Sequence, residues 1–83
     1  MIREIIQNFL NSDRESIPLN YFPLKTYQEI LKDLGYTFYD TDLNGWQVDF
    51  WQYFQNEDKT KKLCLSGSLW FGNFKLTKVQ DES

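Results

Sequence analysis

The sequence predicts a two-layer α+β fold, in which two N-terminal helices pack on one face of a four-stranded antiparallel β-meander. Three observations predict it. Apolar residues recur at helical spacing over residues 2–11 and 26–34. From residue 36 onward they alternate with a period of two. The length of 83 residues leaves too little core for two domains, so we expect residues 1–83 to form one domain.

The first helix is predicted over roughly residues 2–11. Five apolar side chains fall at i, i+3, i+4, i+7 and i+8 and therefore share one helix face: Ile2, Ile5, Ile6, Phe9 and Leu10. The polar residues 11–13 then end the pattern.

Residues 12–25 are expected to be irregular, because Pro18 and Pro23 lack a backbone N–H and restrict the residue before them. The apolar residues of this segment are Ile17, Leu19, Tyr21, Phe22 and Leu24. A free linker would leave that surface in water, so we expect the segment to pack over the core. The alternative is an arm that docks on a partner through Tyr21 and Phe22.

The second helix is predicted over residues 26–34, with signals at both ends. Thr26 and Glu29 have the spacing of a capping box, in which each side chain accepts from the backbone N–H of the other residue. The apolar stripe of this helix consists of Tyr27, Ile30, Leu31 and Leu34. Gly35 follows at the position where a left-handed C-terminal cap is needed.

Strands are predicted at residues 36–39, 46–55, 62–71 and 74–79. The links between them are residues 40–45, residues 56–61 and the dipeptide Gly72-Asn73. Links this short favour an antiparallel meander. The polar residues 80–83 are expected to fray.

Alternation along these strands predicts one apolar sheet face, turned toward the helices, and one mixed face. The apolar face consists of Trp46, Val48, Phe50, Phe54, Leu63, Leu65, Leu69, Phe71, Phe74 and Leu76. The mixed face carries four large aromatic residues, Tyr39, Trp51, Tyr53 and Trp70. A bulge at Gly67 would reverse the alternation beyond it and exchange Leu69 with Trp70.

Residues 40–45 match the first half of a calcium loop, in which Asp40, Asp42 and Asn44 would supply oxygen ligands. The second half does not match, because Trp51 occupies the position of the bidentate Glu. Asn-Gly between two strand patterns is also a strong hairpin signal. We therefore predict a hairpin turn here and no metal site.

Catalytic chemistry has few candidate residues. The chain has no His, which excludes Ser/His and Cys/His pairs and His/Cys zinc sites. The single Cys64 falls in a predicted strand with no cation beside it in sequence, as expected of a structural thiol. Asp40, Asp42 and Asp49 are close in sequence, but an acid–base pair needs a cleft, for which a domain of this size has little room. We expect neither enzymatic activity nor a cofactor.

Charge and composition narrow the partners and the compartment. A net charge of -3 argues against nucleic acid, because phosphates must be neutralised by cations. No apolar run approaches the roughly 20 residues of a membrane span, and the first residues do not read as a secretory signal. A lone Cys64 fits a reducing compartment, so we expect a cytoplasmic protein. The abundance of Ile, Asn, Lys, Tyr and Phe is typical of an AT-rich bacterial or phage gene.

The function that the sequence favours is an interaction or regulatory module that binds another protein, or a second copy of itself, through the aromatic sheet face. The residues expected to contact the partner are Trp51, Tyr53, Tyr39, Trp70, Asp49, Tyr21 and Phe22. One alternative is a small-molecule or glycan binder that stacks its ligand on the same rings, with Asp49, Gln47 and Asn44 as polar contacts. The other is that residues 12–25 cover the face, or that its rings simply pack on one another.

Overall fold

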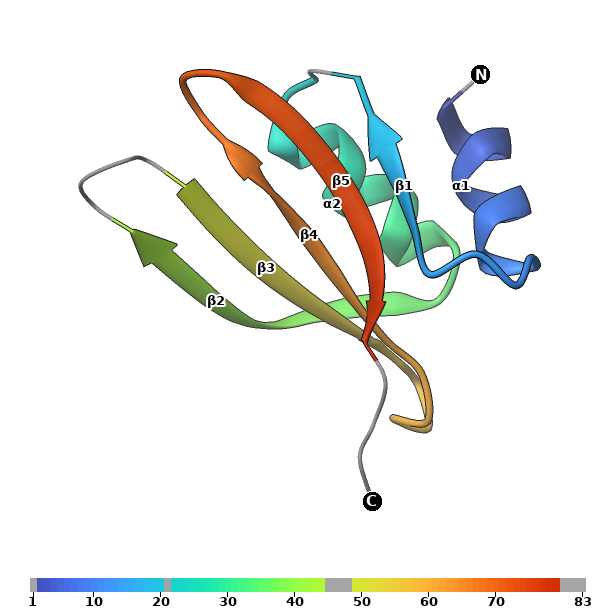
Figure 1. Cartoon of the computed structure of the whole chain (residues 1–83). Helices are drawn as coiled ribbons and strands as arrows, with labels where there is room; N and C mark the ends of the chain where they lie inside the picture. The colour runs from blue at the N-terminus through green and yellow to red at the C-terminus, as the bar shows by residue number, and fades with distance from the viewer. Residues whose placement is uncertain (1, 21, 45–48, 80–83) are drawn as a thin grey trace.

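The computed structural model describes residues 2–20, 22–44 and 49–79, with residues 43 and 44 described by their backbone alone. The elements in chain order are α1 (Ile2–Leu10), β1 (Ser16–Leu19), α2 (Leu24–Asp33), β2 (Tyr36–Asn44), β3 (Asp49–Asn56), β4 (Lys62–Ser68) and β5 (Gly72–Val79) (Figure 1). The strands form one antiparallel sheet in the order β1-β5-β4-β3-β2. The predicted combination of two helices with an antiparallel sheet is confirmed, but the sheet has five strands rather than four.

The fifth strand, β1, lies in the segment that was expected to be irregular. It pairs with β5, so that Ile17 faces Leu76 and Leu19 faces Phe74. The two apolar residues alternate with exposed neighbours, and Ile17 is buried. Pro18 fits because an edge strand needs a bonded neighbour on one side only, and its missing N–H costs no ladder bond when it points to the free side.

Helix α1 is held to the sheet at its C-terminal end. Ile6 and Phe9 are its buried residues. The Ser12 hydroxyl donates to the Phe9 carbonyl at 2.7 Å and so satisfies an acceptor at the helix end. The Lys78 ammonium on β5 donates to the Ser12 carbonyl and lies 4.9 Å from the Phe9 ring centroid. These contacts join the first and last elements of the chain.

Helix α2 begins at Leu24, two residues before the predicted start. Its N-cap is Pro23, and no side chain caps it, so the predicted capping box of Thr26 and Glu29 is wrong. The Thr26 N–H instead donates to the Pro23 carbonyl at 2.9 Å, because the helix has already started and Thr26 lies inside its first turn. The C-terminal prediction is confirmed: Gly35 has φ +94 and its N–H donates to the Lys32 carbonyl.

Strand β2 is longer than predicted and contains a bulge. It continues to Asn44, and the register shifts by one residue between Phe38 and Asp40. Residues 40–44 of the predicted link therefore belong to β2. Asp40 and Asp42 fit a strand here because both lie on the sheet face away from the core, which needs no apolar residues. The rest of the link and the predicted positions of Trp46, Gln47 and Val48 lie outside the described residues.

Strand β4 ends three residues earlier than predicted, at Ser68. Ser68 pairs with Gly72, and Leu69–Phe71 form the turn to β5. Gly72 and Asn73, which were predicted to form the turn, are instead the first two residues of β5. Both have positive φ, +78 for Gly72 and +49 for Asn73. The pairing with β5 shifts between Ser66 and Ser68, but the extra residue lies on β5 and not at Gly67, where a bulge was considered. Leu69 and Phe71 are exposed rather than on the apolar face, because they belong to the turn.

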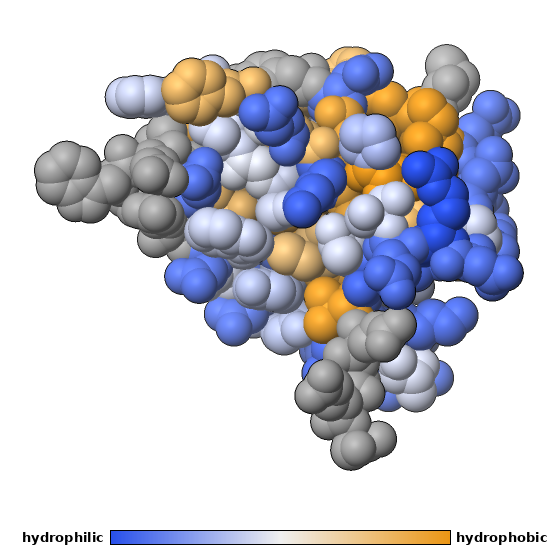
Figure 2. All heavy atoms as spheres, in the orientation of Figure 1, coloured by the Kyte–Doolittle hydropathy of each residue, from blue (hydrophilic) through white to orange (hydrophobic). Residues whose placement is uncertain are grey.

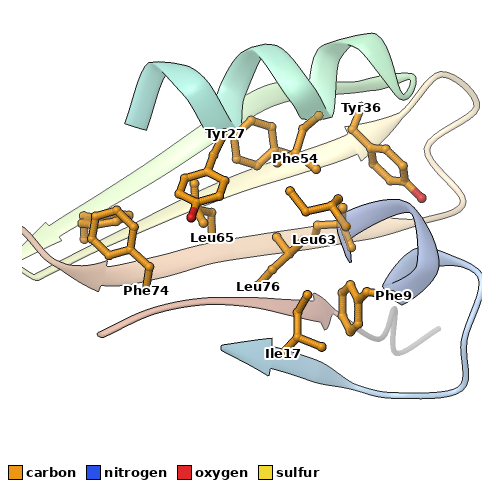
Figure 3. Close-up of a cluster of buried hydrophobic side chains, with 12 residues drawn as sticks. Phe9, Ile17, Tyr27, Tyr36, Phe54, Leu63, Leu65, Phe74 and Leu76 are labelled. Atoms are coloured by element: carbon orange, nitrogen blue, oxygen red, sulfur yellow. The ribbon is translucent and has the colours of Figure 1, made fainter. Parts of the chain in front are cut away.

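The core is one cluster between the helices and the sheet (Figure 3). It consists of Ile6, Phe9, Ile17, Tyr27, Leu31, Tyr36, Phe50, Phe54, Leu63, Leu65, Phe74 and Leu76. Its aromatic rings meet edge to face, with centroids 5.3 Å apart for Phe50 and Phe74 and 6.1 Å apart for Tyr27 and Phe74. The Tyr27 hydroxyl donates to the Asn20 carbonyl. Neither described helix is long and apolar enough to cross a membrane.

Candidate functional site

The sheet face turned away from the core cluster is called the outer face below. In Figure 1 α2 lies behind the sheet and α1 lies beyond the β1 edge, and neither helix covers this face. Strand β1 extends the sheet beside β5 instead of folding over it. Of the segment 12–25, Phe22 packs against the core with its ring 6.2 Å from that of Tyr27. Tyr21 lies outside the described residues.

Two neighbouring rows in the middle of the outer face follow the same pattern in the strand register. The first row is Asp40, Tyr53, Cys64 and Thr77, on β2, β3, β4 and β5 respectively. The second row is Asp42, Trp51, Ser66 and Lys75 on the same four strands. Each row therefore presents an acid, an aromatic ring, a small side chain, and a hydroxyl or an ammonium.

The small side chains form a trough along β4. Cys64 is 8% exposed and Ser66 is 6% exposed, although no described element lies over them. The taller side chains on either side, Trp51 and Tyr53 on β3 and Lys75 on β5, account for this burial. Trp51 itself remains 36% exposed. The outer face thus has a ridge of aromatic rings beside a trough of small residues.

In Figure 2 the outer face is a mosaic of hydrophilic and pale residues, and the strongest hydrophobic colour lies beside β1 and α1. Pale colour is expected where Trp and Tyr side chains gather, since both combine an apolar ring with a polar group. The face is therefore amphipathic and does not resemble a second core surface.

The bulge in β2 adds Tyr39 to the aromatic ridge. The Tyr39 ring centroid lies 6.3 Å from that of Tyr53 and 5.9 Å from the Lys62 ammonium nitrogen. Phe38, the preceding residue, points to the opposite face and meets the Phe54 ring at 5.7 Å. Tyr39 and Phe38 are similarly exposed, at 42% and 48%, but on opposite sides of the sheet.

Two titratable groups on the outer face, Tyr53 and Cys64, have pKa values above their ordinary values. Burial raises the pKa of Tyr53, and the negative charges of Asp42 and Asp40 raise it further. Burial also raises the pKa of the Cys64 thiol, which the Lys75 charge offsets only in part. Cys64 is therefore a protonated, shielded thiol, the state of a structural rather than a nucleophilic cysteine.

A shallow depression of about 300 Å³ opens on the outer face where β3, β4 and β5 approach the turn. Its lining includes Trp51, Phe71, Ser66, Ser68, Asp49 and Lys75. Two aromatic rings thus border a floor of small residues, with one acid and one ammonium at the margin. Asp49, a predicted contact residue, lies here at the start of β3.

The turn Leu69–Phe71 projects its apolar side chains into solvent. Trp70 and Phe71 are each 75% exposed. The Ser68 hydroxyl accepts from the N–H groups of both residues, each at 3.2 Å, which holds the turn backbone in place. Trp70 was predicted on a strand face beside Trp51, and that placement is wrong because β4 ends before it.

The sequence reasoning placed Ser66 and Lys75 on the mixed face without naming them as contact residues, and it missed Phe71 as part of this surface. Phe71 was assigned to the core because the strand was extended through the turn. The small residues Cys64 and Ser66, two apart on the predicted outer face, were the available signal for the trough. Lys75 could be placed opposite Ser66 only once the pairing of β4 with β5 was known.

The described residues offer no site at which a metal ion would bind. No group of three or more His, Cys, Asp or Glu residues among them lies close enough to hold an ion. Asp40 and Asp42 occupy neighbouring rows of β2 instead of a loop, so the hairpin turn predicted at residues 40–45 is wrong for residues 40–44.

A second cavity, of about 580 Å³, lies at the other end of the sheet, near Tyr36 and Leu63. Lys61, Lys62 and Lys78 contribute to its lining. Two of these ammonium groups are engaged elsewhere, Lys62 over the Tyr39 ring and Lys78 with the Ser12 carbonyl. The cavity therefore lacks the converging cations that an anionic ligand would need.

No family model, curated protein or solved structure matches this chain. Its function is therefore argued from the outer face itself.

Proposed function

We propose that this chain is a non-catalytic interaction module that binds another protein chain through its outer face. The observation that carries the proposal is the aromatic ridge of Tyr39, Trp51 and Tyr53. These rings project from the sheet face opposite the core, and no described element covers them. Large aromatic side chains that become desolvated at the centre of an interface commonly contribute about 2–4 kcal/mol each to binding.

The surroundings of the ridge also suit a protein interface. Charged side chains border it on both sides, Asp40 and Asp42 on β2 and Lys75 on β5. An apolar centre with a charged rim is the usual composition of such surfaces. At one end, the turn Leu69–Phe71 adds further exposed apolar area.

A small-molecule or glycan ligand is the second candidate, supported by the depression between Trp51 and Phe71. Its volume of about 300 Å³ is at the lower limit for ligand pockets, about 300–1,000 Å³. A groove closed by residues 12–25 would have favoured this candidate, but β1 lies beside β5 at the sheet edge. An open depression buries little of a ligand, so a protein partner is the better fit.

We place the module in the cytoplasm. The support is the free, buried Cys64 thiol, which needs no oxidising compartment to fulfil a structural role.

Position-specific photo-crosslinking tests the proposed function. A photoreactive phenylalanine analogue replaces Tyr39 in one variant and Phe38 in the other, in cells of the source organism. The two positions are adjacent and similarly exposed, but only Tyr39 lies on the outer face. We expect discrete protein adducts from position 39 and none from position 38, with loss of those adducts when Trp51→Ala is added. Equal adducts from both positions, or adducts that Trp51→Ala leaves unchanged, would contradict the proposal.

A further inference from the structure

The outer face is complementary to itself. In its two middle rows the residues run, strand by strand from β2 to β5, from an acid through an aromatic and a small residue to a hydroxyl or an ammonium. In such an order the first column matches the fourth by charge or hydrogen bonding, and the second matches the third by shape. A two-fold axis that lies in the interface, parallel to the strands and between β3 and β4, brings the matching columns of two copies together.

We propose that two copies of this chain form a symmetric dimer by stacking their outer faces about that axis. The inference rests on the proposed function, because it takes the outer face as the contact surface and names a second copy as the partner. In this arrangement β3 of one copy lies over β4 of the other, and β2 lies over β5.

Side-chain size supports this pairing. Trp51 lies over the partner's Ser66, and Tyr53 lies over the partner's Cys64. Stacked sheets are separated by about 10 Å. The partner's rings rest above the β4 trough, on the side chains that already shield Ser66 and Cys64, and each ring lies beside the partner's ring rather than against it. An axis along β3 would instead set Trp51 against the partner's Trp51, where two large rings compete for the same space.

Charge supports the same axis. Asp42 lies opposite the partner's Lys75, and the symmetry makes this contact twice. Asp40 in the neighbouring row lies opposite the partner's Thr77, whose hydroxyl can donate to a carboxylate. An axis along β4 would set Asp42 over the partner's Pro18 on β1 and Lys75 over the partner's Trp51 on β3. Neither charged side chain would then face an opposite charge.

The size of the face predicts a weak dimer. Four strands at about 4.8 Å spacing and seven residues at about 3.3 Å give roughly 19 by 23 Å. The two copies together then contribute about 900 Å² in projection, below the roughly 1,200 Å² of standard stable interfaces. We therefore expect association at micromolar rather than nanomolar concentration.

Charge exchange across the interface tests the proposal by sedimentation velocity over a concentration series. Asp42→Lys alone and Lys75→Asp alone each place like charges opposite one another twice, and we expect each to weaken dimerisation at least tenfold. An equimolar mixture of the two variants restores both opposite-charge contacts, so it should form a heterodimer within about threefold of the wild-type affinity. Glu29→Lys on α2 is the control and should leave dimerisation unchanged, because Glu29 lies on the helix side.

Two results would overturn the dimer. One is a wild-type chain that stays monomeric up to millimolar concentration. The other is a dimer that the two single variants do not weaken or that their mixture does not restore, which would place the contact on another surface. A monomeric chain that still forms Trp51-dependent adducts from position 39 with a different protein would refute self-association while supporting the proposed function. A monomeric chain without such adducts would refute both.

Discussion

Replacing Gly67 with Ala is expected to destabilise the fold by about 2 kcal/mol, through a steric conflict in the β4–β5 hairpin. A Cβ atom on Gly67 would lie 2.5 Å from Cδ1 of Phe74 and 2.9 Å from the carbonyl oxygen of Gly72. Carbon atoms that are not bonded to each other normally approach to about 3.5–4.0 Å. The Phe74 ring would therefore have to move by about 1 Å.

The surroundings of Phe74 prevent a movement of that size at low cost. Its ring packs edge to face against Phe50 and Tyr27 in the core. Overpacking a tight core costs up to about 3 kcal/mol, and the conflict with a backbone carbonyl places this case near that limit. Restricting the unfolded chain by a Gly-to-Ala change returns about 0.4–1 kcal/mol. The net loss is therefore about 2 kcal/mol.

Urea unfolding of a double-mutant cycle measures this effect. The four proteins are the wild type, Gly67→Ala, Phe74→Val and the double variant. Val has no δ carbon to meet the new Cβ, so we expect the double variant to be at least about 1 kcal/mol more stable than the sum of the single losses predicts. Strictly additive losses would show that Phe74 is not the source of the conflict, and an unchanged stability of Gly67→Ala would refute the steric reasoning altogether.

Three further predictions concern the two faces and the helix end. Trp51→Ala should lower the free energy of unfolding by less than about 1.5 kcal/mol, whereas Phe50→Ala, its neighbour on the buried face, should cost about 3–5 kcal/mol in the same urea assay. The free energy of unfolding should fall as pH rises past 9.0, because burial raises the pKa values of Cys64 and Tyr53 and the folded state holds these protons more tightly. Cys64→Ser should delay the onset of that fall, and an identical pH profile would contradict it. Gly35→Ala should cost about 1 kcal/mol from its φ of +94 alone, since no atom lies near the new Cβ, and Gly35→Asn should cost less.

The helices and the main core were predictable because their signals are local. Ile6 and Phe9 in α1, and Tyr27 and Leu31 in α2, are buried as their spacing indicates. An amphipathic segment has only one face that it can bury, so the periodicity of apolar residues is sufficient to find it. Phe50 and Phe54 followed in the same way from the period of two in β3.

The errors arose where local signals competed with distant pairing. Thr26 and Glu29 have the spacing of a capping box, yet Pro23 allows the helix to start earlier, and this brings Leu24 into the first turn. The short strand β1 was missed because a single Pro18 is a strong local signal against a strand. Its partner β5 lies more than 50 residues later in the chain, and no local pattern reports such a contact.

Alternation along the strands by itself determined that Trp51 and Tyr53 share a face opposite to Phe50 and Phe54. Only the tertiary structure decided which side chains lie beside them on that face. The placement of Cys64 and Ser66 next to the aromatic ridge depends on strand register. Register is determined by turns and bulges, and a shift of one residue moves every side chain to the other face. Periodicity excludes a shift of one residue, but a shift of two keeps the same residues buried, so composition and periodicity leave that choice open.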